Sequence, residues 1–270
     1  MLKSLNFTAS ITDSQEAAYR IMLTRSQLSS DLSLLALLDA EVVTRWIAER
    51  RHIITYPVTN HTIYNISTNQ PVVNFASAPS ETYTTKEPEI VMLEVFEDFC
   101  PTVLKLLNLI PEEEVCEWKL RIHEPLSTWI NGSVALVGDA CHTSLSHMSQ
   151  GGARSVEDGS VLGVVLANLP DASPDAINKA LRVYEKIRKQ RAEMLVELAA
   201  ASARNLHLGE GKAKEERDRI FREFREKGGK APVPDKWADA EVQKMVYGID
   251  CVKLHESNSR ICIILCAPND

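Results

Sequence analysis

The sequence predicts a mixed α/β (α+β) protein, and three stretches of the chain support this fold class. Residues 51–75 are rich in β-branched and aromatic side chains, with turn residues between the runs, as expected of antiparallel strands. Residues 129–163 begin with a short apolar run and end in a helical pattern. Residues 174–206 carry an apolar stripe at helical spacing and predict a long helix that begins at Pro174.

The first fifty residues give mixed signals. Residues 14–25 fit a short helix, and they fit equally well a strand through residues 18–23, because periodicity alone does not decide. Residues 27–50 have leucines at helical spacing and predict a helix. For the β-rich part that follows, we expect an antiparallel meander of three strands, near 53–58, 62–67 and 71–75.

The other elements follow from local pattern. Residues 76–90 are polar and predict a loop, and residues 90–110 have helical spacing that Pro101 divides. Residues 115–123 alternate as a strand. Towards the C-terminus we expect a charged helix ending at Gly228-Gly229, a short helix ending near Gly248, and a strand over 260–267.

Length and composition limit the classes of function. With 270 residues we expect a sheet domain over 1–112, a second domain with the long helix over 113–206, and a helical extension over 207–270. The net charge of −7 and interleaved basic residues argue against nucleic acid as a partner. The chain has no apolar run of membrane-spanning length and no secretory signal, so we expect a cytoplasmic protein.

The six cysteines are scattered, and no C-x-x-C pair occurs. This pattern predicts reduced, mostly buried thiols in a reducing compartment. Clustered Cys and His spacing is absent, so we expect no metal site.

The stretch 129–163 has the layout of a ligand site. The apolar run 134–137 is bounded by Gly132 and Gly138 and predicts a buried strand, with Asp139 at its C-terminal end. A polar loop then leads to Gly151 and Gly152, where a helix begins. Glycines let a ligand approach the backbone closely, and a helix N-terminus offers free N–H groups to an oxyanion.

This stretch resembles the second flavin-binding motif of the single-component FAD-dependent aromatic hydroxylases, the group of salicylate hydroxylase and p-hydroxybenzoate hydroxylase. The departures from the family pattern are Cys141, Ser146 and Gly152. The residues in register are Trp129, Gly132, Val134, Leu136, Gly138, Asp139, Ala140, His142, Gln150, Gly151, Glu157, Asp158 and Gly159.

The resemblance covers about residues 10–250, through the segments EAAYR, WIAERRHIITYPV, YEKIRKQRA and WADAEVQKMVYGID. A full member of the family begins with a strand, a G-x-G-x-x-G turn and a helix that hold the FAD pyrophosphate, and this sequence contains no such motif. The resemblance therefore implies an N-terminally truncated member. Its fold would be a partial FAD-binding Rossmann-like domain without the N-terminal βαβ unit, an antiparallel β-sheet substrate domain and C-terminal helices.

The resemblance also implies residue roles. Asp139 would contact the ribityl or pyrophosphate part of FAD, and Gly151 and Gly152 would lie against the isoalloxazine. Arg20 and Tyr56 match the pair that orients a phenolate substrate over the flavin, since a cation stabilises a phenolate and a tyrosine hydroxyl positions it. The activity implied is a monooxygenase that hydroxylates a small aromatic, phenolic substrate with NAD(P)H and O₂, in secondary metabolism.

Each assignment has a structural alternative. Asp139 and the glycines also fit an ordinary strand-to-helix turn, and Arg20 and Tyr56 also fit a surface arginine and a core tyrosine. We expect His142 to be structural and Trp118, Trp129 and Trp237 to be core residues. The alternative function is a non-catalytic remnant or binding module, or one half of a split enzyme whose partner is a separate N-terminal flavin-binding half.

Overall fold

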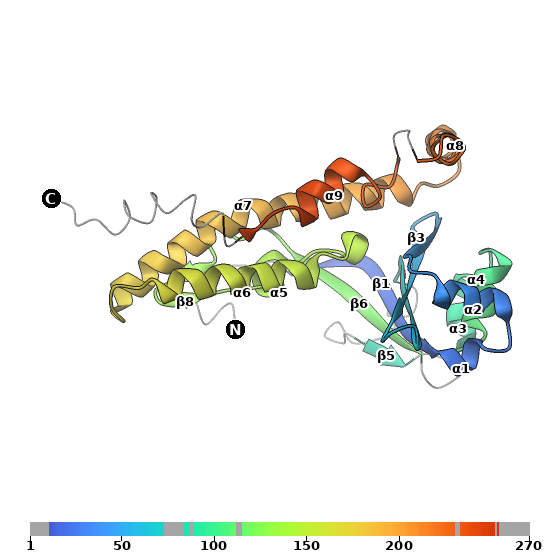
Figure 1. Cartoon of the computed structure of the whole chain (residues 1–270), viewed down its shortest axis with the longest axis horizontal. Helices are drawn as coiled ribbons and strands as arrows, with labels where there is room; N and C mark the ends of the chain where they lie inside the picture. The colour runs from blue at the N-terminus through green and yellow to red at the C-terminus, as the bar shows by residue number, and fades with distance from the viewer. Residues whose placement is uncertain are drawn as a thin grey trace. The chain divides into compact units, whose positions relative to one another are not determined.

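The computed structural model describes the chain as two compact units, each taken here by itself (Figure 1). The sheet unit comprises residues 13–120 and 206–218, and the helical unit comprises 1–12, 121–205 and 219–270. The residues described are 11–72, 84–86, 89–111, 115–229, 233–251 and 253. No helix in this described part is long and apolar enough to cross a bilayer.

A six-stranded sheet forms the centre of the sheet unit. Its order is β2 (Thr44–Ala48), β3 (Arg51–Val58), β4 (Ile63–Pro71), β1 (Ile11–Thr24), β6 (Cys116–His123) and β5 (Thr84–Lys86). The β2, β3 and β4 strands pair antiparallel in sequence order, and β4 pairs antiparallel with β1. The strand alternative for residues 14–25 is therefore the one that the structure adopts.

Four short helices cover one face of this sheet, namely α1 (Arg25–Leu28), α2 (Leu32–Asp39), α3 (Glu89–Val95) and α4 (Pro101–Leu107). Their side chains pack against Tyr19, Ile21, Leu23, Tyr64 and Ile66 in one core. Every second residue of β1 and β4 thus points into this core. A slip of one residue would expose the whole apolar set, so burial fixes the strand register.

Three predictions for this region need correction. The expected helix over 27–50 is two short helices followed by strand β2, because residues 44–48 pair with β3 and Trp46 packs against the core. The expected third strand near 71–75 is not separate from the second: β4 ends at Pro71, and residues 73–75 lie outside the described part. The loop expected over 76–90 contains strand β5, which pairs with β6.

The described residues of the helical unit form two very short strands, four helices and the second half of a fifth helix, α8, whose residues up to Asp218 belong to the sheet unit. The elements are β7 (Ile130–Asn131), β8 (Val134–Ala135), α5 (Asp139–His142), the 3₁₀ turn Ser146–Met148, α6 (Gly151–Ala167), α7 (Pro174–Leu206), α8 (Lys212–Glu226) and α9 (Ala240–Tyr247). Helix α7 has the predicted bounds, α8 stops just before Gly228-Gly229, and α9 ends at Tyr247 with Gly248 as its C-cap, close to the expected end. The predicted strand over 260–267 lies outside the described residues.

The core of the helical unit lies where α6, α7 and the segment before α5 meet (Figure 1). Trp129, Leu136, Val161, Leu181 and Tyr184 are all buried there. The rings of Trp129 and Tyr184 are 5.9 Å apart, and the Tyr184 hydroxyl donates a hydrogen bond to the Leu136 carbonyl at 2.9 Å. This packing fixes the chain that leads into the Gly138–Asp139 turn.

Two expectations about burial are wrong. The run 134–137 is not a buried strand: β8 has two residues, and the side chains of Val134 and Val137 are 41% and 44% exposed. Within the described residues β8 pairs only with β7, and a strand needs neighbours on both sides to be buried. Of the three tryptophans expected in the core, Trp129 is buried, Trp237 is half-buried and Trp118 is exposed.

Candidate functional site: the turn at Gly138 and the face of the sheet

Gly138 has a backbone conformation that only glycine adopts easily. Its φ is 60° and its ψ is −140°, a combination that a Cβ atom disfavours strongly. A Cβ atom at this position would also lie 2.6 Å from the hydroxyl oxygen of Ser155 on α6. The chain can therefore reverse direction here, between the strand-like run and α5, against the side of α6.

The buried side chain of Asp158 stabilises this turn through hydrogen bonds. Its side chain is fully buried, and its Oδ2 accepts hydrogen bonds from the Gly138 N–H at 2.9 Å and from His142 Nε2 at 2.6 Å. Its Oδ1 accepts a bond from Arg188 Nε at 2.9 Å. Burial acts to raise the pKa of Asp158, but the bonds from His142, Gly138 and Arg188 outweigh it and hold the pKa below its ordinary value. Asp158 is thus a buried carboxylate with three donors.

A second acidic residue ties three helices together. The Glu157 carboxylate accepts hydrogen bonds from Arg191 at 2.8 and 3.0 Å. It also forms an ion pair with Arg188, in which Oε2 of Glu157 lies 2.5 Å from Nη1 of Arg188. Arg191 in turn donates to the backbone carbonyls of Met245 and Val246 on α9. Glu157 and Asp158 therefore bind α6 to α7, and Arg191 continues the connection to α9.

The carboxylate of Asp139 lies at the surface beside the start of α6. The residue is exposed, and its Oδ1 is 4.0 Å from where a Cβ of Gly151 would be. No hydrogen bond engages this carboxylate among the described residues. Gln150, the N-cap of α6, makes no side-chain capping bond, and Gly152 is exposed with open space around it.

These features suit a ligand that carries hydroxyls and an electron-rich carbonyl or oxyanion. A free carboxylate accepts hydrogen bonds from hydroxyls, whereas the first amides of a helix donate to oxygen atoms. The two glycines leave the backbone open to a flat ring. The residues present therefore fit the ribityl chain and ring edge of a flavin, and the structure brings Asp139, Gly151 and Gly152 together in the helical unit.

Cys141, His142 and Asp158 place three potential metal ligands within 4.8 Å of one another. The Asp158 carboxylate already accepts three hydrogen bonds, and burial raises the pKa of Cys141 to about 12. A thiol with this pKa is not a thiolate at neutral pH, and metals bind the thiolate. These residues are better explained as supports of the Gly138 turn than as metal ligands.

Arg20 and Tyr56 lie in the sheet unit, on strands β1 and β3. Arg20 is opposite Ser67 of β4, and Tyr56 is opposite Asn65 of the same strand. Residues directly opposite each other point to the same side of a sheet, and so do residues two positions apart. Arg20 and Tyr56 therefore share the face opposite the helix-covered core. Arg20 is exposed, and Tyr56 is half-buried.

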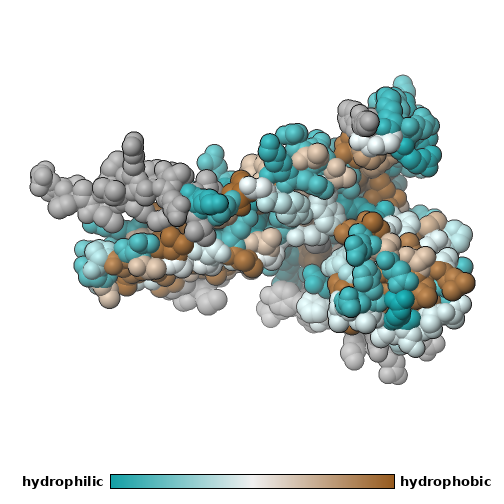
Figure 2. Space-filling model, in the orientation of Figure 1, coloured by the Kyte–Doolittle hydropathy of each residue, from teal (hydrophilic) through white to brown (hydrophobic). Residues whose placement is uncertain are grey.

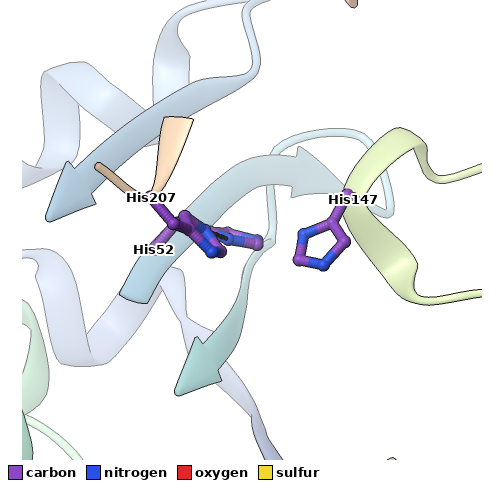
Figure 3. A group of neighbouring side chains, drawn as sticks. All are labelled: His52, His147 and His207. Atoms are coloured by element: carbon purple, nitrogen blue, oxygen red, sulfur yellow. Dashed lines mark hydrogen bonds between the residues drawn. The ribbon is translucent and has the colours of Figure 1, made fainter. Parts of the chain in front are cut away.

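A histidine pair in the sheet unit was not anticipated from the sequence. His52 Nδ1 on β3 lies 2.8 Å from His207 Nε2, just beyond the end of α7, and both rings are drawn in Figure 3 with His147 of the helical unit. The neighbouring Arg50 N–H donates to the His207 carbonyl at 3.2 Å. The pair thus fastens residues 206–218 to β3. No local motif signals it, because 155 positions separate the two residues.

The sequence alone does not indicate that four charged residues act together, although all of them stand in the segments that resemble the family, namely Glu157, Asp158, Arg188 and Arg191. The spacing of these residues in the sequence could have indicated that they form ion pairs. Two adjacent acids on one helix and two arginines three positions apart on the next can form two ion pairs side by side.

Comparison with known proteins shows the family of the chain. The family model described as FAD binding domain matches residues 37–199. Over 203 residues the chain is 33% identical to an FAD-dependent monooxygenase of an Arthrinium species, covering 75% of this chain and 47% of that protein. Over 158 residues it is 32% identical to the 6-hydroxynicotinate 3-monooxygenase of Pseudomonas fluorescens, covering 58% of this chain and 39% of that protein.

A solved structure titled as a salicylate hydroxylase substrate complex has the same fold. The match has a TM-score of 0.69 at 22% identity, and it covers 96% of this chain and 58% of the solved one. The chain spans about half the length of the relatives that match at least 75% of it, between 47% and 55% of each relative. Because the family model matches more than half of its residues, the chain belongs to the FAD binding domain family.

Proposed function

We propose that this chain forms part of an FAD-dependent monooxygenase that hydroxylates a small phenolic compound with NAD(P)H and O₂. The observation that carries the proposal is the open Asp139 carboxylate beside the uncapped N-terminus of α6. The monooxygenase names of the relatives support the reaction class, and the fungal relative supports a role in secondary metabolism.

The helical unit would hold the cofactor. Asp139 would accept hydrogen bonds from ribityl hydroxyls, and the amides of Gly151 and Gly152 would face the ring edge. Asp158 would act through Gly138, because its hydrogen bond to that N–H sets the direction in which the chain presents Asp139. When bound, FAD supplies the activation of O₂ and the transfer of an oxygen atom to the ring.

The sheet unit would hold the substrate. The guanidinium of Arg20 would stabilise a phenolate, which is more electron-rich than the neutral phenol and so a better acceptor for oxygen. Tyr56, on the same face, would hydrogen-bond a substrate oxygen and fix the orientation of the ring. The rigid register of β1, β4 and β3 would hold both side chains in place.

Helix α6 presents one open surface that could pack against a further part of the flavin site. The surface of α6 that carries Gly152, Val156, Gly159 and Gly163 is open: Val156 is 71% exposed, and a Cβ at any of the three glycines would meet no atom. In Figure 2, hydrophobic (brown), pale and hydrophilic (teal) residues are mixed over the region that Figure 1 labels α6. We propose that this face packs against a βαβ unit of the flavin site, since small residues allow close helix-to-strand packing.

The test is an assay of the purified full chain with FAD, NADH or NADPH, and 2,4-dihydroxybenzoate as a trial phenol. Oxygen uptake and product formation would be followed with the chain alone and with the part of the Arthrinium relative that this chain does not match added in trans. We expect phenol-dependent NAD(P)H oxidation in at least one of these mixtures.

Two variants test the proposed roles of Arg20 and Tyr56 in substrate binding. Arg20→Gln and Tyr56→Phe should each lower phenol hydroxylation about tenfold or more, as expected for loss of a charge-assisted or positioning hydrogen bond. Arg222→Gln, a change at another exposed arginine, is the matched control and should have no effect. A chain that neither binds FAD nor gains activity with the added segment would contradict the proposal and favour a non-catalytic binding module.

A further inference from the structure

The face of the sheet that carries Arg20 and Tyr56 also carries two further polar residues between them. Strand β4 runs between β1 and β3, and its Asn65 and Ser67 point to the same side as Arg20 and Tyr56. Ser67 is directly opposite Arg20, and Asn65 is directly opposite Tyr56. The four residues therefore form two neighbouring pairs on one surface.

Burial of the other face holds this arrangement. The alternate residues Ile21, Tyr64, Ile66 and Ile53 of the same strands are all buried in the core of the sheet unit. A change in register would turn these side chains towards solvent. The four polar residues are accordingly held on a rigid backbone. A rigid backbone allows a small number of side chains to bind a ligand specifically.

Other polar side chains of this sheet are engaged with each other. On the core face, the hydroxyls of Thr55 and Tyr64 are 2.6 Å apart, and on the opposite face Asn69 donates to Glu16 at 2.8 Å. Arg20, Tyr56, Asn65 and Ser67 differ: within the described part of the chain, none of their side chains takes part in a hydrogen bond or ion pair. Their donors and acceptors remain available to a ligand.

The spacing matches a substituted aromatic ring. Side chains directly opposite on neighbouring strands begin about 5 Å apart, and β1 and β3 lie about 10 Å apart across β4. Arg20 with Ser67 offers a cation and a hydroxyl at one end, which suits an anionic oxygen. Tyr56 with Asn65 offers groups that both donate and accept at the other end, which suits a hydroxyl or carbonyl.

We propose that Asn65 and Ser67 are substrate-binding residues that select aromatic compounds with two oxygen substituents on opposite sides of the ring. Ser67 supports the anionic oxygen bound by Arg20, and Asn65 binds the second oxygen together with Tyr56. This inference rests on the proposed function and narrows its substrate class to polyoxygenated aromatics.

Two probes that differ by one hydroxyl test this directly. Binding of 2-hydroxybenzoate and of 2,4-dihydroxybenzoate to the full chain is measured by calorimetry or by ligand-observed NMR. We expect the second probe to bind about tenfold more tightly, as one well-placed hydrogen bond allows. In Asn65→Leu the preference should fall to about twofold or less, with the affinity for 2-hydroxybenzoate unchanged, because only the second hydroxyl loses its partner.

The remaining variants are controls and complements. Ser67→Ala should weaken both probes by a similar factor, and Asn65→Asp should weaken both by charge repulsion of their carboxylates. Met22→Leu changes an exposed neighbour in the same cross-strand row and should leave the preference intact. Circular dichroism checks that each variant folds.

A tenfold preference that survives in both Asn65 variants would overturn the inference, and so would the absence of any preference in the unmodified chain. Neither result depends on whether the chain binds FAD. The proposed function would then still be decided by FAD binding and by the effects of Arg20→Gln and Tyr56→Phe on turnover.

Discussion

Asp158 is an ionised carboxylate with no exposure to solvent, and its surroundings explain how it remains charged. Three donors from two segments converge on it, namely the Gly138 N–H and His142 from the turn and helix α5, and Arg188 from α7. With Asp158 ionised, His142 carries its proton on Nε2, since that nitrogen faces the carboxylate. Asp158 on α6 thus links the Gly138 turn to α7.

Replacing Asp158 with Asn should be strongly destabilising. The amide removes one of the two carboxylates beside Arg188, so that only Glu157 remains, and it removes the charged acceptor of the hydrogen bonds from Gly138 and His142. The loss of these charge-assisted hydrogen bonds at a buried site costs about 3 kcal/mol. Urea unfolding of Asp158→Asn should show a free energy of unfolding lower by about that amount. Glu124→Gln, at an exposed carboxylate in the same unit, serves as control. Equal stability of the two variants would show that the Asp158 network contributes nothing.

At the scale of elements, local pattern and long-range contact explain different parts of the fold. Helix α7 begins at Pro174 and α4 at Pro101, as the sequence predicts, because a proline at the first helical position is a local signal. Strand β2 was missed because its pairing with β3, and not its own periodicity, makes it a strand. The strand expected over 134–137 failed for the converse reason, since its apolar pattern lacks sheet neighbours among the described residues.

The Gly138 turn gives a prediction at this scale. Gly132 and Gly138 both have φ near 60°, but only at Gly138 would a Cβ collide with the Ser155 hydroxyl, at 2.6 Å. Gly138→Ala should therefore lower the free energy of unfolding by at least about 1 kcal/mol more than Gly132→Ala. Adding Ser155→Ala should recover part of that difference. Equal free energies of unfolding for the two glycine variants would contradict the proposed collision between a Cβ atom at position 138 and Ser155.

At the scale of the whole molecule, the candidate site could be predicted only in part. Asp139, Gly151 and Gly152 follow one another in a motif, so the sequence brings them together. The shared face of Arg20 and Tyr56 depends on the register of three strands, and the support from Asp158, Arg188 and Arg191 depends on how α6 packs on α7. No local pattern specifies either relation, although the family resemblance indicated the residues.

Low pH should decrease the free energy of unfolding, because it protonates the buried carboxylates. The pKa values of Asp158 and Glu157 lie below their ordinary values in the folded chain, although burial alone would raise them. Their contribution to stability is therefore complete above the unfolded-state pKa values, about 3.9 and 4.3, and is lost as the pH falls through the folded values. The stability difference between the unmodified chain and Asp158→Asn should shrink below about pH 4. A difference independent of pH from 7 to 3 would contradict this.

The central claim is that the open carboxylate of Asp139 and the start of α6 form a flavin site. Titration of the full chain with FAD, followed by flavin fluorescence and by equilibrium dialysis, tests it most directly. We predict saturable binding of one FAD per chain, an affinity about tenfold weaker in Asp139→Ala, as expected for loss of a charge-assisted hydrogen bond, and no change in Glu124→Ala. A chain that binds no FAD at saturating concentrations, or an Asp139→Ala variant that binds it as tightly as the unmodified chain, would contradict the claim.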